Sequence, residues 1–196
     1  MITTKDKPGK VIVITAPSGA GKTTLAKKLL QDIPNLVFSV SATTRAPRAQ
    51  EVHGKDYYFL DHKTFVKYIE EGRFLEHEEF YNGSLYGTLR SDVENHRKKG
   101  YFVLFDVEVK GAINLKNVYG AECMSLFIKP PDMQTLEQRL KSRGTESEET
   151  MKLRLKRASM ELSKSGQFDH EIINDNFDEA YDRVKQLVND FMNSQA

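Results

Sequence analysis

The sequence predicts an α/β fold built around a central parallel sheet. An apolar, β-branched run at residues 11–15 is joined by a short glycine-containing loop to a helical pattern at residues 25–30. Further apolar runs of strand length alternate with helical patterns along the chain, an arrangement that gives parallel strands with crossover helices. The length of 196 residues suits one compact body that can carry smaller inserted lobes.

The loop after the first strand has the pattern of a phosphate-binding loop. It consists of Ala16, Pro17, Ser18, Gly19, Ala20, Gly21, Lys22, Thr23 and Thr24. Between a strand and a helix, Lys22 can reach the β- and γ-phosphates of a nucleotide and the Thr23 hydroxyl can bind Mg²⁺. The usual pattern opens with glycine, so Ala16 implies a negative φ there. A glycine-rich turn without a ligand is the alternative, but the position of Lys-Thr favours a nucleotide.

Hydrophobic periodicity predicts the elements that follow. Residues 36–41 are expected to form a second strand parallel to the first. Residues 42–90 contain short strand-like runs around a helical pattern at 63–71, which predicts a small, mostly antiparallel inserted lobe. Asp132 or a neighbour is expected to cap the helix that follows it. The later helices are expected at 92–99, 111–117, 133–141, 151–164 and 177–192, and the later strands at 101–105, 123–128 and 171–174.

Composition limits the classes of protein that fit. The formal net charge of +1 argues against a protein that covers nucleic acid with positive charge. Cys123 is the only cysteine and lies in an apolar run, which indicates a core thiol in a reducing compartment. No segment approaches the ~20 apolar residues of a membrane span, and residues 1–10 lack an apolar segment suited to secretion. We therefore expect a cytoplasmic protein that binds neither nucleic acid nor membrane.

Two groups of arginines are candidates for binding phosphate. Arg45 and Arg48 flank Pro47, which stiffens the turn, and together with Tyr57 they could clamp a second phosphate. Two later helical patterns carry Arg139, Arg143, Arg154 and Arg157. A mobile helical flap with these arginines could stabilise a phosphoryl group during transfer and exclude water. In both cases a solvated basic surface is the alternative.

Three carboxylates stand at positions suited to chemistry. Asp106 and Glu108 follow the strand at 101–105, so we expect them at the carboxyl end of the sheet, in the same crevice as Lys22. They could hold Mg²⁺ or accept a hydrogen bond from a substrate, and helix capping is the alternative. Glu76 in the inserted lobe could accept the N1–H and N2–H₂ donors of guanine, which adenine lacks. A solvent-facing glutamate on an edge strand is the other interpretation.

Together these segments resemble the guanylate kinases over nearly the whole chain. The motifs are the loop at 16–23, Thr-Thr-Arg-Ala-Pro-Arg at 43–48, Gly-Lys-Asp-Tyr at 54–57, Phe-Leu-Glu at 74–76, Tyr-Gly-Thr at 86–88 and Arg-Gly-Thr-Glu at 143–146. The resemblance implies an α/β fold: a three-layer P-loop kinase core with a central parallel sheet, an inserted mixed α/β GMP-binding lobe and a helical lid. The core is expected at 1–40, 92–130 and 162–196, the lobe at 41–91 and the lid at 131–161.

The resemblance also implies roles for individual residues. The ATP site would comprise residues 16–24 together with Asn174, which is expected near the adenine. The GMP phosphate would be bound by Arg45, Arg48, Tyr57 and Tyr86. Guanine would be recognised by Ser41, Glu76 and Thr88, with Asp106 at the acceptor site. Mg²⁺ is expected on Thr23, with Asp106 and Glu108 as further candidates. Phosphoryl transfer would depend on Lys22, Arg45, Arg139, Arg143 and Arg154.

The reaction implied is phosphoryl transfer from ATP, bound with Mg²⁺, to GMP, which gives ADP and GDP, in a monomer or homodimer. Two alternatives remain open. A sugar-bisphosphate kinase of related fold would keep the loop and lid but would not need Glu76 and Thr88 to recognise guanine. An inactive guanylate-kinase-like interaction domain would be expected to have a damaged loop or lid, whereas Lys22, Thr23 and the lid arginines are all present.

Overall fold

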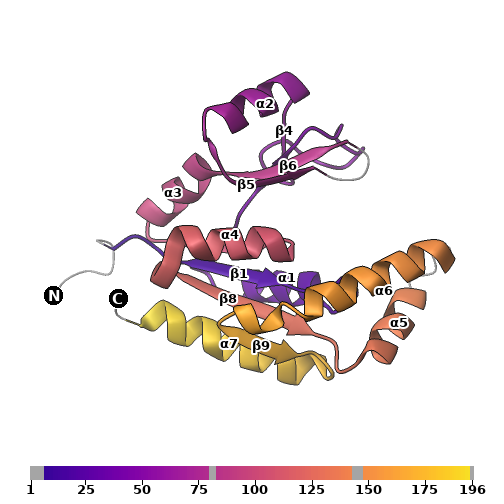
Figure 1. Ribbon diagram of the computed structural model, residues 1–196. Helices are drawn as coiled ribbons and strands as arrows, with labels where there is room; N and C mark the ends of the chain where they lie inside the picture. The colour runs from indigo at the N-terminus through magenta and orange to yellow at the C-terminus, as the bar shows by residue number, and fades with distance from the viewer. Residues whose placement is uncertain (1–6, 80–82, 143–147, 195–196) are drawn as a thin grey trace.

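The computed structural model describes residues 7–79, 83–142 and 148–194, and within these residues the strands form two sheets (Figure 1). The strands of the central sheet are β1 (Val11–Thr15), β2 (Leu36–Phe38), β7 (Phe102–Asp106), β8 (Cys123–Lys129) and β9 (His170–Ile173). Their order is β2-β7-β1-β8-β9, and every neighbouring pair is parallel. The predicted α/β class with a central parallel sheet is therefore confirmed.

Helices cover both faces of the central sheet. They are α1 (Lys22–Asp32), α3 (Arg90–Lys98), α4 (Val109–Tyr119) and α7 (Phe177–Asn193). Helices α1 and α7 pack on one face, and α3 and α4 pack on the other. Successive residues of β1 point to opposite faces, so Ile12 and Ile14 join the first core while Val11 and Val13 join the second. The result is a three-layer core with β1 buried at its centre.

The inserted lobe has a four-stranded mixed sheet in the order β4-β3-β6-β5. Its elements are β3 (Ser41–Thr43), β4 (Tyr58–Phe59), α2 (His62–Glu70), β5 (Phe74–Glu79) and β6 (Leu85–Leu89). Strand β6 pairs antiparallel with β3 and β5, whereas β3 pairs parallel with β4. Phe65 of α2 stacks on Phe74 of β5 with ring centroids 4.4 Å apart, which gives the lobe a small core of its own.

The prediction of one strand over residues 36–41 is wrong, because the chain changes sheets within it. Strand β2 pairs with β7 in the central sheet and ends at Phe38. The Ser39 N–H still donates to the carbonyl of Leu104, at 2.9 Å. From Ser41 onward the backbone pairs with β6 in the other sheet. The crossing therefore places Ser41 at the junction between the core and the lobe.

Two helices beyond the carboxyl end of β8 form the segment expected to be the lid. They are α5 (Met133–Lys141) and α6 (Glu148–Leu162), which pack together through Leu136, Leu140 and Ala158. As predicted, Asp132 caps α5, since its carboxylate accepts the Thr135 N–H at 2.6 Å. Short 3₁₀ turns cover Gly120–Glu122 and Ser165–Gln167. Among the described helices, none is long and apolar enough to cross a membrane.

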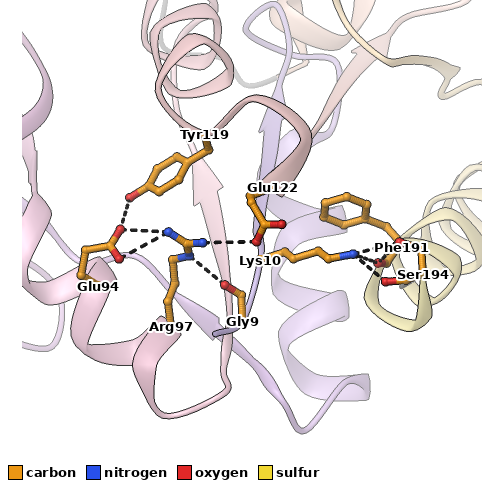
Figure 2. A network of polar contacts seen from close by, with 8 residues as sticks. All are labelled: Gly9, Lys10, Glu94, Arg97, Tyr119, Glu122, Phe191 and Ser194. Carbon is orange, nitrogen blue, oxygen red and sulfur yellow. Dashed lines mark hydrogen bonds and ion pairs between the residues drawn. The ribbon is translucent and has the colours of Figure 1, made fainter. Parts of the chain in front are cut away.

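A polar network ties the start of the chain to α3 and α4 (Figure 2). The Arg97 Nε donates to the Gly9 carbonyl at 2.7 Å, and its other nitrogens contact Glu94 and Glu122. Tyr119 lies against the Arg97 guanidinium, 4.7 Å from ring centroid to carbon, and donates to Glu94. A Cβ at Gly9 would lie 1.8 Å from the Tyr101 carbonyl oxygen. The network therefore fixes the backbone that leads into β1. Only glycine fits at position 9, because any Cβ would clash with the Tyr101 carbonyl.

Candidate active site

The loop between β1 and α1 has the backbone that phosphate binding requires. Gly19 and Gly21 have φ values of 95° and 94°, a left-handed conformation that favours glycine. Gly21 immediately precedes α1, so the loop ends at a helix N-terminus, where backbone N–H groups attract anions. Ala16 is buried and has a negative φ, as predicted from its side chain. Its presence in place of glycine therefore does not disturb the loop.

The end of β7 brings an acid to the phosphate loop. Ile14 of β1 is in register with Asp106, and the Asp106 carboxylate lies 2.5 Å from the Lys22 ammonium. Thr23 Oγ1 donates to the other carboxylate oxygen at 3.3 Å, and Lys22 also donates to the Val107 carbonyl at 3.2 Å. Lys22, Thr23 and Asp106 therefore form one contact group at the carboxyl edge of the sheet.

A pocket of about 320 Å³ lies between this edge and the inserted lobe. It is lined by Lys22, Ser41, Tyr57, Glu76, Glu78, Tyr86, Gly87, Asp106, Val107 and Glu108. Its size suits a small-molecule ligand. Four carboxylates and one ammonium line it, so a strongly anionic ligand would need further cations, which the arginines at its edges can supply.

Glu76 and Thr88 form a hydrogen-bonded pair in the wall of the lobe. They face each other across β5 and β6, and the Thr88 hydroxyl donates to Glu76 Oε1 at 2.7 Å. A Cβ at Gly111 of α4 would lie 3.2 Å from Glu76 Oε2. Burial raises the pKa of Glu76, an effect that the bond from Thr88 partly opposes. Strand β5 is at the sheet edge, yet Glu76 faces the pocket, which argues against the solvent-facing interpretation.

Arg45 is held by residues of the lobe. Its two terminal nitrogens donate to the Glu51 carboxylate at 2.9 and 2.8 Å, and its Nε donates to the Tyr86 hydroxyl at 3.3 Å. The guanidinium carbon lies 5.3 Å from the centroid of the Tyr57 ring, which is a cation–π contact. The Arg48 side chain is exposed. Arg45, Tyr57 and Tyr86 thus lie together, with Arg48 on the adjacent surface.

Glu51 is a member of this group that the sequence did not single out. It accepts both Arg45 nitrogens and also the Arg48 N–H at 2.8 Å. These bonds lower its pKa to about 2, so Glu51 is ionised at neutral pH. Its position in the basic loop, three residues after Arg48, could have indicated an acid that pairs with one of the arginines. Glu51 therefore fixes the orientation of the Arg45 guanidinium next to the pocket.

The arginines of α5 and α6 lie near the phosphate loop and the end of β9. Arg154 donates to Ser18 Oγ of the phosphate loop at 3.0 Å, and Arg139 donates to the Asn174 carbonyl at 2.9 Å. Arg143 lies outside the described residues. Arg157 bridges Glu161 on its own helix, at 2.8 Å, and Glu108 in the pocket wall, at 2.9 Å. The sequence suggested a solvated or mobile arginine there and did not identify Glu161 as its partner.

Oxygen ligands suited to Mg²⁺ are present near the loop. Thr23 Oγ1 and an Asp106 oxygen are adjacent, and hard oxygen ligands are what Mg²⁺ prefers. Glu108 is engaged by Arg157 instead. In the described part of the chain, no group of three or more histidines, cysteines, aspartates or glutamates is arranged to hold a metal by itself. A magnesium site here would therefore need the phosphates of a nucleotide as ligands.

The fold and the site define a phosphate-loop protein of the kinase type. The family model described as guanylate kinase matches residues 8–191. The guanylate kinase of Chlorobium chlorochromatii (strain CaD3) is 48% identical over 184 residues, which cover 94% of this chain and 96% of that one. For the guanylate kinase of Chlorobaculum tepidum the identity is 46%, with 94% of each chain covered. The chain belongs to the guanylate kinase family.

A solved structure agrees with this assignment. The crystal structure of guanylate kinase from Anaplasma phagocytophilum matches with a TM-score of 0.75 and 32% sequence identity. The match covers 98% of this chain and 91% of that one. The expected combination of core, inserted lobe and helical lid is thereby confirmed as the fold.

Proposed function

We propose that this protein transfers the γ-phosphoryl group of ATP to GMP, which yields ADP and GDP. The observation that carries the proposal is Glu76, which lines the same pocket as Lys22 and Asp106 and accepts a hydrogen bond from the buried Thr88 behind it. A partly engaged carboxylate offers acceptors for the N1–H and N2–H₂ groups of guanine. Because adenine lacks this pair of donors, it would leave the buried carboxylate with only its bond from Thr88.

Transfer requires the two phosphates to be aligned and their charge to be stabilised. An oxygen of the GMP phosphate attacks the γ-phosphorus in line, and the bond from that phosphorus to the β–γ bridging oxygen breaks. The pair of electrons leaves with ADP. No general base is needed, because the GMP phosphate is already largely ionised at neutral pH. The protein therefore contributes position and positive charge rather than covalent chemistry.

The donor and acceptor sites divide these tasks. Lys22 would leave Asp106 to contact the β- and γ-phosphates, with Arg139, Arg143 and Arg154 closing over them. Arg45, Arg48, Tyr57 and Tyr86 would bind the GMP phosphate. Mg²⁺ bound by Thr23, with Asp106 directly or through water, would neutralise charge on the β- and γ-oxygens.

A coupled assay with GMP, AMP, CMP and UMP as acceptors tests the proposal. We expect GMP to be turned over with the highest kcat/KM, and Lys22→Ala to lower kcat, with Lys27→Ala on the exposed face of the same helix as the control. Equal turnover of AMP would contradict guanine recognition by Glu76. Faster turnover of a sugar bisphosphate would favour the related kinase, and no turnover of any acceptor would favour an inactive interaction domain.

A further inference from the structure

Asn174 connects three parts of the molecule directly after β9. The residue is 5% exposed. Its backbone N–H donates to the Lys129 carbonyl at 2.7 Å, and its carbonyl accepts the Arg139 guanidinium at 2.9 Å. Its side-chain Nδ2 donates to the Ala20 carbonyl of the phosphate loop at 2.8 Å, in a fully buried contact. The residue therefore joins the end of β8, the lid helix α5 and the loop.

The amide also packs against the loop backbone. A Cβ built on Gly21 would lie 2.2 Å from Asn174 Nδ2, so the amide fits there only because residue 21 has no side chain. A Cβ on Gly19 would lie 3.1 Å from both Leu136 and Leu140 of α5. Gly21 thus lies against Asn174, and Gly19 lies against α5.

The hydrogen bond to Ala20 has a consequence for the next peptide unit. In a trans peptide the C=O and the following N–H point in opposite directions. When Asn174 holds the Ala20 carbonyl toward itself, the Gly21 N–H points away from Asn174. This N–H precedes α1, where backbone donors can contact a bound phosphate.

We propose that Asn174 is a positioning residue for the phosphate loop, which it orients through the Ala20–Gly21 peptide. This inference rests on the donor site described under the proposed function. The role differs from the adenine contact expected from the family resemblance, because it acts on the phosphates of any donor and does not depend on the base. Through its backbone carbonyl, Asn174 also places Arg139 beside the same loop.

Binding of inorganic tripolyphosphate, which has no base, separates the two roles. We expect Asn174→Ala to weaken tripolyphosphate and ATP binding by the same factor, about twofold to tenfold, the equivalent of one hydrogen bond. Isothermal titration calorimetry measures both affinities. The KM for ATP should rise and kcat should fall, whereas the KM for GMP should stay unchanged.

Two further variants guard against a general loss of structure. Asn174→Leu keeps nearly the same volume and removes the donor, so it should show the same loss if Asn174→Ala does not fold. Asn176→Ala removes the cap of α7, where Asn176 accepts the Asp178 N–H at 2.9 Å. It should lower the midpoint of thermal unfolding, because a helix cap is lost, with tripolyphosphate affinity unchanged. Circular dichroism confirms that each variant is folded.

The outcomes are distinct. Weaker ATP binding with unchanged tripolyphosphate binding would assign Asn174 to the base and overturn the proposal. Unchanged binding of both would overturn it as well. If the wild-type protein binds tripolyphosphate but does not phosphorylate GMP, the proposed function fails, while the calorimetric comparison still decides the role of Asn174.

Discussion

Replacing Glu76 by glutamine tests how the protein would select its acceptor base. The Thr88 hydroxyl donates to Glu76 Oε1 at 2.7 Å, and the single oxygen of a glutamine can take that bond. Its NH₂ group would then occupy the position of Oε2, beside Gly111. A donor would face the N1–H and N2–H₂ donors of guanine. The variant therefore keeps the shape of the site and reverses its hydrogen-bonding pattern.

The expected loss follows from the kind of bond removed. A hydrogen bond to a charged group contributes about 1.5–3 kcal/mol, and each 1.4 kcal/mol corresponds to about a tenfold change. The kcat/KM for GMP should therefore fall by about 10-fold to 150-fold. The KM for ATP should not change, because Glu76 lies in the lobe and not at the phosphate loop.

The assay compares GMP with IMP, which lacks the 2-amino donor. Wild-type protein should prefer GMP, and Glu76→Gln should lose more activity with GMP than with IMP. Glu78→Gln is the matched control, because Glu78 lines the same pocket two residues along β5. It removes the same charge and should change kcat/KM by less than about threefold. A loss under threefold in Glu76→Gln, or an equal loss in Glu78→Gln, would refute the reasoning.

The same residue predicts a dependence on pH. Burial raises the pKa of Glu76 above its ordinary value of 4.5, so the carboxylate form is lost at a higher pH than for an exposed glutamate. Because only the carboxylate accepts both guanine donors, the KM for GMP should rise as pH falls toward that raised pKa. Glu76→Gln should show only the titration of the GMP phosphate. Identical pH profiles for the two proteins would contradict this assignment.

Two further substitutions test the network around Arg97 and the contact between Arg45 and Glu51 in the lobe. Arg97→Met leaves the Gly9 carbonyl without its side-chain donor, and urea unfolding should show a loss of about 1–3 kcal/mol. The exposed Arg183→Met should stay within about 0.5 kcal/mol of wild type, and a loss below 1 kcal/mol in Arg97→Met would contradict the role of the network. Glu51→Gln weakens the brace on Arg45 and should raise the KM for GMP by about threefold to tenfold with a smaller change in kcat. An unchanged KM would show that Arg45 does not need Glu51.

The central sheet could be predicted because its strands are buried on both faces. Runs such as Val11–Thr15 and Phe102–Asp106 are apolar almost throughout, which is the pattern of a parallel core strand. Strand β6 gave no such pattern. Its Gly87 is required by tertiary packing, since a Cβ there would lie 2.9 Å from the Glu76 carbonyl oxygen. The change of sheet after Ser39 could not be predicted either, because apolar residues continue on both sides of it and no turn residue marks the point.

The sequence predicted those site residues that lie at or just after the carboxyl end of a strand. Lys22 and Asp106 were expected in one crevice, and the structure places them in contact. Glu51 could not be found in this way, because a loop without periodicity does not indicate which way its side chains point. The contact of Asn174 with Ala20 joins residues 154 positions apart, which only the folded chain brings together.

The strand order has a consequence for how such a protein can be altered. The phosphate loop follows β1 and Asp106 ends β7, two strands held in fixed register by the hydrogen bonds of the central sheet. Glu76 and Thr88 come from a different sheet with its own hydrophobic core. Under the proposed function, choice of base and geometry of transfer would thus depend on separate structural units. Substitutions confined to the lobe would then be expected to change the acceptor while the contacts of Lys22 with Asp106 stay intact.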